Sequence, residues 1–153
     1  MIHLLHGAAG TPGDWDEFIP LLHREDVRAV DLCEKEETSL DGFAASFNSS
    51  ASQGDAIIGY SMGGRLALHA ILADTHPWSC AVIISAHSGI LNTNDREKRA
   101  KSDLRWAELA SRDWEEFIVE WASQRIFGGK ALPWNRSDES KIDRRTQRCF
   151  TSW

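Results

Sequence analysis

One serine stands in a sequence pattern that could carry out nucleophilic chemistry. Residues 59–63 read Gly-Tyr-Ser-Met-Gly, with an apolar run before them and a helix-like run after them. Two glycines allow a sharp strand-to-helix turn, which lifts the hydroxyl of Ser61 to the carboxyl-terminal edge of a sheet. Backbone N–H groups at the start of the following helix would face developing negative charge. The pattern predicts Ser61 as a nucleophile, and a plain tight turn is the alternative.

A second segment fits the same chemistry. His6 and Gly7 end an apolar run and open a loop of small residues. In a site of this kind, one oxyanion donor is the N–H of the residue after the nucleophile, and the other comes from such a loop. The pattern predicts Met62 and Ala8 as these donors, with an ordinary glycine-rich turn as the alternative reading of the loop. His6, at the start of the loop, is predicted to contact the substrate.

Among the other histidines, His87 stands out by its position. It follows the apolar run 80–85, and ligands of open α/β sheets bind at the carboxyl-terminal edge of the strands. We predict that His87 lines the site, and a role as general base is left open. The remaining histidines are expected to pack, to lie in a loop or to face solvent: His3, His23, His69 and His76.

Strand-like and helix-like runs alternate over the first part of the chain. The predicted strands are residues 2–6, 27–32, 54–59 and 80–85. Apolar residues at spacings of three and four predict helices between them, at residues 14–22, 39–52 and 62–73. Pro20 is expected to keep the first of these helices short or to end it. Since the strands are apolar rather than alternating, they indicate a parallel sheet that helices cover on both faces.

The last third of the chain has a different character. Two amphipathic, charged and Trp-rich stretches predict helices at residues 95–110 and 111–127, and residues 138–148 are a weaker candidate. The sequence after residue 91 contains no strand-like run. We therefore divide the chain into an α/β part, residues 1–90, and a helical cap or lid, residues 91–153.

Composition and charge exclude several classes of protein. The net charge is −6: residues 1–90 hold 4 Lys and Arg against 12 Asp and Glu, whereas residues 91–153 hold 13 against 11. An acidic chain is a poor nucleic-acid binder, and no apolar run approaches the ~20 residues that span a bilayer. Three widely spaced cysteines without a Cys-x-x-Cys pair argue against a zinc site and favour a reducing cytoplasm. The first residues lack the basic region of a signal peptide.

Several local motifs together resemble the α/β-hydrolase superfamily and, within it, the MenH family of menaquinone biosynthesis. Leu-Leu-His-Gly near the N-terminus and Asp14-Trp15 are similar to that family's first segment, and residues 59–65, Gly-Tyr-Ser-Met-Gly-Gly-Arg, are similar to its elbow. Residues 99–107 and 117–127 look like its helical cap. The resemblance implies an α/β-hydrolase fold with a parallel sheet, flanking helices and a cap after the fourth strand. It implies no cofactor and no metal.

The resemblance also implies a reaction. Members of the MenH family eliminate pyruvate from an anionic succinyl-cyclohexene carboxylate, with serine and histidine acting in proton abstraction and basic residues holding the carboxylates. Arg65 would be such a ligand, because a planar guanidinium pairs well with a carboxylate, and a surface position on the helix is the alternative. In the cap, the resemblance implies substrate contacts from Arg99, Lys101 and Trp121. Spacing leaves open which basic cap residue faces inward, and core packing is the alternative for Trp121.

The motifs end before the catalytic acid and base of this fold. The expected chain order is Ser, Asp, His, with the last two on later strands. Here the last histidine is His87 and no strand-like run follows residue 91, so we expect the C-terminal strands of the fold to be missing from this chain. Three explanations stay open: a truncated fragment, a substitute dyad of His87 with an acid such as Asp31, and an inactive relative that only binds a ligand. A carboxylesterase with a serine nucleophile is the alternative enzyme.

A sheet without its last strands leaves an open apolar edge, which is a known route to association. We therefore expect this chain by itself to dimerise or aggregate, or to pair with a missing C-terminal fragment. Its small-molecule partner would be an anionic substrate, and neither a nucleic acid nor a membrane is expected.

Overall fold

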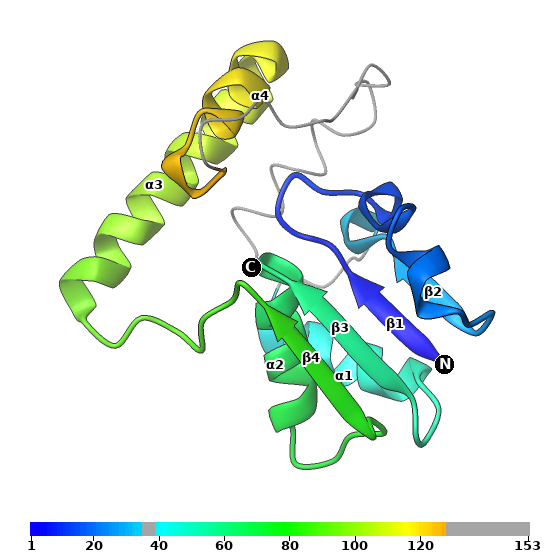
Figure 1. Ribbon diagram of the computed structural model, residues 1–153. Helices are drawn as coiled ribbons and strands as arrows, with labels where there is room; N and C mark the ends of the chain where they lie inside the picture. The colour runs from blue at the N-terminus through cyan, green and yellow to red at the C-terminus, as the bar shows by residue number, and fades with distance from the viewer. Residues whose placement is uncertain (35–38, 128–153) are drawn as a thin grey trace. The chain divides into compact units, whose positions relative to one another are not determined.

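Four parallel strands form one sheet in the computed structural model, which describes residues 1–34 and 39–127 (Figure 1). The strands are β1 (Ile2–Leu5), β2 (Val27–Val30), β3 (Ala56–Tyr60) and β4 (Cys80–Ile84), in the order β2-β1-β3-β4. Every neighbouring pair is parallel. The predicted parallel sheet is confirmed, and the strand ends lie close to their predicted positions.

Helices α1 (Leu40–Ser50) and α2 (Met62–Leu72) lie together on one face of the sheet, behind it in Figure 1. Helix α1 begins after Ser39, whose hydroxyl accepts a hydrogen bond from the Gly42 N–H at 3.0 Å. A serine in this position satisfies one of the unpaired N–H groups of the first turn. The apolar sides of both helices are buried, as the spacing of their apolar residues predicts.

The segment between β1 and β2, where the sequence predicts a helix at residues 14–22 that Pro20 keeps short or ends, contains no α-helix. It forms two 3-10 turns, η1 (Pro12–Trp15) and η2 (Ile19–Leu22), and the second ends at His23 in a left-handed conformation with φ 49°. Pro20 has no N–H to donate to the preceding turn, which prevents one continuous helix. The apolar side chains of the segment still cover the sheet over β1 and β2.

The pleat of the sheet separates two unequal faces. On the side of α1 and α2, Ile57 is fully buried. On the other side, the turns η1 and η2 pack against Leu4 and Ile58 but leave part of β4 open. Val82 is 44% exposed and Ile84 is 36% exposed. Among the described residues, η1 and η2 thus cover this face over β2, β1 and β3 and leave these two β4 side chains exposed.

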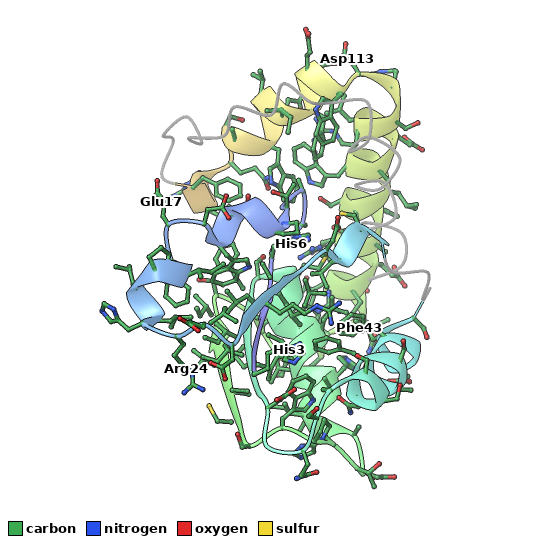
Figure 2. All side chains as sticks on the ribbon, turned by 90° about the vertical axis from the view of Figure 1, so that its right-hand side faces the viewer. His3, His6, Glu17, Arg24, Phe43 and Asp113 are labelled. Carbon is green, nitrogen blue, oxygen red and sulfur yellow. The ribbon has the colours of Figure 1, made fainter. Side chains whose placement is uncertain are left out.

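One buried polar cluster joins the start of β1 to the turn before β3. Asp55 accepts hydrogen bonds from the Met1 ammonium at 2.6 Å, from His3 Nε2 at 2.9 Å and from the Ser52 N–H at 3.0 Å. The Met1 ammonium, then His3, then Ser52 hold the pKa of Asp55 well below its usual range. The His3 ring lies inside the fold, edge-on to Phe47 of α1 (Figure 2).

The described residues 91–127 belong to a second compact unit. It contains α3 (Thr93–Arg112), α4 (Trp114–Ala122) and the turn η4 (Arg125–Phe127). The weaker helix predicted at residues 138–148 lies outside the described residues. No described helix is long and apolar enough to cross a membrane.

An aromatic cluster forms the core of this second unit. The Trp106 ring meets Phe117 and Trp121 edge-on, with ring centroids 5.9 and 5.1 Å away, and Phe117 stacks on Trp121 at 5.7 Å. Asp113 separates the two helices and caps the second, because its carboxylate accepts from the Glu116 N–H at 2.9 Å. Trp106 and Trp121 of this Trp-rich stretch therefore pack the two helices against each other.

Candidate active site

The predicted nucleophile lies on a strained turn between β3 and α2. Ser61 has φ 52° and ψ −114°, a backbone conformation that residues with a Cβ rarely adopt. Its N–H donates to the Ile84 carbonyl at 2.8 Å, and its own carbonyl accepts from the Arg65 N–H at 3.1 Å. The turn is thus held by β4 on one side and by α2 on the other. Strain of this kind persists only where the surrounding structure imposes it, and it concentrates at functional sites.

Close packing explains the glycines of the motif. A Cβ on Gly59 would overlap the Gly63 carbonyl, and a Cβ on Gly63 would stand 2.6 Å from the His6 carbonyl oxygen. A Cβ on Gly64 would stand 2.6 Å from Ala86 Cβ. These three glycines let α2 start directly against the ends of β1 and β3 and against the segment that follows β4.

The loop after β1 reaches the nucleophile. The Gly10 N–H donates to the Gly7 carbonyl at 3.0 Å, which closes a tight turn around Ala8. A Cβ on Gly7 would stand 3.1 Å from the Tyr60 ring and 3.5 Å from Ser61 Cβ. Ala8 is the next residue in a loop that abuts the elbow, which is the position required of the predicted oxyanion donor.

Met62, the other predicted donor, is the first residue of α2. The N–H groups on either side of it are engaged, since Ser61 donates to Ile84 and Gly63 donates to the His6 carbonyl at 3.1 Å. The N–H of a first helical residue has no carbonyl one turn earlier in its own helix. Met62 therefore lies at a helix start, where unpaired amides can bind an anion, and its role as an oxyanion donor stays a prediction.

The imidazole of His6 supports the loop from the interior (Figure 2). The residue is 1% exposed, its Nδ1–H donates to the Gly7 carbonyl at 2.8 Å, and its Nε2 accepts from the Leu32 N–H at 3.1 Å. These two partners assign the neutral ring with its proton on Nδ1, because a carbonyl only accepts and an amide N–H only donates. The geometry supports a positioning role for His6 rather than the substrate contact predicted from the sequence.

Among the described residues, His6, Asp31 and Cys33 form a group with the composition of a metal site. Their ligand atoms lie within 4.8 Å of one another. However, Nε2 of His6 accepts from Leu32, and Oδ1 of Asp31 accepts from the Cys33 N–H at 2.9 Å. Backbone hydrogen bonds thus already order this cluster. Sequence reasoning did not find it, although its members follow the ends of two adjacent parallel strands.

His87 lies on the exposed loop after β4, where its Nδ1 accepts from the Gly89 N–H at 3.1 Å. The loop starts beside the nucleophile, because the Ser61 N–H is bonded to the Ile84 carbonyl and Ala86 packs on the first turn of α2. His87 therefore follows the strand next to the elbow. Within the described part of the chain, no hydrogen bond joins its ring to the Ser61 hydroxyl, so its role as a base stays a prediction.

Arg65 is half-buried in the first turn of α2. Its backbone N–H donates to the Ser61 carbonyl, so the guanidinium belongs to the turn of helix that directly follows the nucleophile. This is a suitable origin for a side chain that binds an anionic group of a substrate held at Ser61.

The predicted cap contacts all belong to the second unit. Arg99 pairs with Asp103 along α3, with 2.7 Å between Nε and a carboxylate oxygen. Lys101 is exposed on the same helix. Trp121 lies in the aromatic cluster, which supports its alternative role in core packing.

An open groove of about 840 Å³ lies at the other end of α2, away from its Ser61 end. Its lining includes Asp41, Asn48, His69 and His76. The His69 Nδ1 stands 3.5 Å from an Asp41 carboxylate oxygen. The groove shares no lining residue with the elbow, so it does not extend the candidate site.

Comparison with known proteins agrees with this geometry. The model of the Esterase family, described as "Putative esterase", matches residues 39–149, a range that includes the Ser61 elbow. The chain belongs to this family and has the α/β-hydrolase fold.

More specific relatives share one name. The 2-succinyl-6-hydroxy-2,4-cyclohexadiene-1-carboxylate synthase of Pectobacterium atrosepticum is 27% identical over 135 residues, which cover 80% of this chain and 53% of that protein. The synthase of the same name from Salmonella heidelberg is 36% identical over 73 residues, 46% of this chain and 29% of that protein. The chain spans about half the length of the curated relatives that it matches over most of its own length.

Solved structures agree on the fold. MenH from S. aureus superposes with a TM-score of 0.82 at 20% identity, covering 99% of this chain and 65% of that one. Carboxylesterase CesB from Bacillus subtilis superposes with a TM-score of 0.59 at 21% identity, covering 99% and 53%. The predicted α/β-hydrolase fold is therefore confirmed.

Proposed function

We propose that this chain carries the nucleophile and the oxyanion loop of a MenH-like enzyme that acts on a small anionic carboxylate. The observation that carries the proposal is the conformation of Ser61, φ 52° and ψ −114°, next to the loop that contains Ala8. A serine held in this way presents its hydroxyl at the sheet edge, where a substrate can reach it.

The proposed roles follow from position. The Ser61 hydroxyl acts at the reacting centre, and the N–H groups of Ala8 and Met62 stabilise negative charge as it develops. Preorganised donors of this kind contribute on the order of 10²–10³ in rate each. Arg65 holds a substrate carboxylate from the first turn of α2.

The reaction proposed is the elimination of pyruvate from a succinyl-cyclohexene carboxylate, in keeping with the relatives that are 2-succinyl-6-hydroxy-2,4-cyclohexadiene-1-carboxylate synthases. Proton abstraction by Ser61 needs a histidine to accept the hydroxyl proton. His87 is one candidate, and a histidine on polypeptide beyond this chain is the other. We place the reaction in the cytoplasm, as the scattered cysteines favour.

A carboxylesterase is the second candidate function. The match to the Esterase family supports it, because an acyl-serine mechanism uses the same elbow and the same two donors. The two functions differ in substrate. An esterase hydrolyses neutral nitrophenyl esters, whereas the MenH-like enzyme requires an anionic substrate and loses activity when Arg65 is removed.

Intact-mass spectrometry before and after treatment with a fluorophosphonate probe tests the shared part of both proposals. We expect one adduct that maps to Ser61 and is absent from Ser61→Ala. His87→Ala then distinguishes the source of the base, since labelling that survives this change requires another base. A folded protein that forms no adduct has an unactivated serine, and the ligand-binding alternative would replace both enzyme proposals.

A further inference from the structure

Three side chains that can ligate a metal ion gather where strands β1 and β2 end. His6 follows β1, and Asp31 and Cys33 follow β2, the parallel neighbour of β1 in the sheet. A ring nitrogen of His6, a carboxylate oxygen of Asp31 and the Cys33 Sγ lie within 4.8 Å of one another. Leu5 pairs with Val30 in the sheet, so the next residue of each strand, His6 and Asp31, meet at the same edge.

The His6 ring already has the protonation state that binds a metal. Its Nδ1–H donates to the Gly7 carbonyl at 2.8 Å, so the ring carries no proton on Nε2. Nε2 lies 3.1 Å from the Leu32 nitrogen and therefore faces the segment between Asp31 and Cys33. Histidines that ligate a metal almost always donate their other N–H to a carbonyl or a carboxylate, which fixes the ring. The Gly7 carbonyl makes that contact here.

The backbone holds the other two side chains near this ring. The Cys33 N–H donates to Oδ1 of Asp31 at 2.9 Å, which closes a tight turn. A carboxylate has about four lone-pair sites, so this hydrogen bond does not exhaust its capacity for a cation. Asp31 and Cys33 are both half-buried. The group is therefore ordered and partly shielded from water, yet within reach of an ion in solution.

The chemistry of the three ligands selects the ion. A thiolate, an imidazole and a carboxylate together suit Zn²⁺, whereas Mg²⁺ and Ca²⁺ prefer oxygen ligands alone. Three protein ligands and one water make up the tetrahedral set of an open zinc site. In such a set the ligand atoms lie about 3.5 Å apart, so the atoms seen within 4.8 Å must approach by no more than about 1.3 Å. Small rotations of the Asp31 and Cys33 side chains supply such a movement.

We propose that His6, Asp31 and Cys33 form a binding site for Zn²⁺, with water as the fourth ligand. The spacing of the cysteines argues against a zinc site made of cysteine pairs, whereas here a single thiolate joins ligands from two strands. The Leu32 N–H gives up its bond to Nε2 when the ion binds, so we expect weaker binding than at a structural zinc site. The bound ion joins the end of β2 to the ring that holds Gly7. The site is independent of the proposed function, because it rests on these three side chains alone.

Cobalt substitution of the reduced whole chain is the first test, because Co²⁺ occupies zinc sites and, unlike Zn²⁺, absorbs visible light. We expect the chain to bind one Co²⁺ with a thiolate-to-cobalt charge-transfer band, and Zn²⁺ to displace it. Cys33→Ser is expected to lose that band. Cys80→Ser is the matched control, since it makes the same change at an exposed cysteine outside the group, and it is expected to keep the band.

Thermal unfolding with and without Zn²⁺ is the second test, because a ligand that binds the folded chain raises Tm. Zn²⁺ is expected to raise the Tm of the unchanged protein and of Cys80→Ser, and to leave the Tm of Cys33→Ser as it is. Loss of even an outer-shell partner costs about 10- to 100-fold in metal affinity, so Asp31→Asn should weaken Zn²⁺ binding at least about tenfold in calorimetry. Circular dichroism without metal verifies that each variant is folded.

The cysteine that holds the ion decides between the outcomes. A folded chain that binds neither ion, or that binds Co²⁺ without a thiolate band, would overturn the proposal. A band that survives Cys33→Ser, or that is lost in Cys80→Ser or Cys149→Ser, would also overturn it, because another cysteine would then be a ligand. The same holds for a rise in Tm with Zn²⁺ that persists in Cys33→Ser.

Discussion

The Gly63 N–H donates a hydrogen bond to the His6 carbonyl at 3.1 Å, which ties the first turn of α2 to the end of β1. The two residues are far apart in sequence, yet their contact brings the elbow and the oxyanion loop together. The same His6 fixes Gly7 through its ring Nδ1. The contact between His6 and Gly63 thus holds Ser61, the predicted nucleophile, near the loop of Ala8, a predicted oxyanion donor.

Replacement of Gly63 by alanine tests this contact. The new Cβ would stand 2.6 Å from the His6 carbonyl oxygen, so backbone must shift. We expect Gly63→Ala to lower the free energy of unfolding by about 1–3 kcal/mol, as overpacking in a close-packed interior does. Chemical denaturation measures this loss. Gly54→Ala is a useful comparison, because Gly54 has open space around it and φ 91°, so only backbone strain acts there.

The strain at Ser61 predicts that the nucleophile costs stability. Glycine adopts φ 52° without a Cβ penalty, whereas alanine does not. We expect Ser61→Gly to be more stable than Ser61→Ala by about 1 kcal/mol, while both abolish labelling by a fluorophosphonate. Thermal unfolding of the two variants side by side provides the measurement. Equal stability, or a less stable glycine variant, would show that the turn is not strained.

The Asp55 cluster predicts sensitivity to acid. The pKa of Asp55 is held below its usual range in the folded state by the Met1 ammonium, His3 and Ser52, so folding favours the ionised carboxylate. The resulting stability is fully present above the unfolded pKa of ~4 and is lost as pH falls below it. Asp55→Asn should lower the free energy of unfolding at pH 7 by about 1–3 kcal/mol.

A pH series separates this effect from a simple loss of packing. Between pH 5 and 2, values chosen to bracket the ~4 of an unfolded aspartate, stability should fall less steeply in Asp55→Asn than in the unchanged protein. Asp26 provides the control, since its pKa is lowered to about 2, mainly by the Arg24 hydrogen bond, but its carboxylate is exposed. Asp26→Asn should change the unfolding curve little at neutral pH. If the free energy of unfolding fell equally steeply with pH in Asp55→Asn and in the unchanged protein, Asp55 would not be the source of the acid sensitivity.

Arg65 distinguishes the two candidate functions. If it pairs with a substrate carboxylate, Arg65→Ala should reduce kcat/KM for the anionic substrate about 10- to 100-fold, mainly through KM. Arg65→Lys should recover only part of the loss, because an ammonium cannot form the paired contact. Release of pyruvate measures activity on the anionic substrate, and hydrolysis of a neutral nitrophenyl ester is the internal control. An equal loss on both substrates would point to a structural role for Arg65.

Local sequence was sufficient for the elements and for the elbow. The strand ends, the start of α2 and the Gly-x-Ser-x-Gly turn depend on neighbours in the chain, and the structure has them close to the predicted positions. The exception is the segment at 14–22, where the sequence predicts a helix that Pro20 keeps short or ends, and the structure has two 3-10 turns. Apolar residues spaced by three and four fit both a short helix and two 3-10 turns, so their spacing does not distinguish the two when Pro20, which has no N–H, lies in the segment.

The sequence by itself determined the parallel α/β sheet, the strand-to-helix turn at Ser61 and the small-residue loop after β1, because apolar runs, glycine spacing and a strand-to-helix junction are local properties. Only the tertiary structure decided that His6 lies buried beneath that loop, that Asp55 receives the Met1 ammonium and His3, and that Asp31 and Cys33 come close to His6. Each of these depends on which strands become neighbours. Those contacts join residues far apart in the chain, and the pattern of a single segment carries no record of its distant partner.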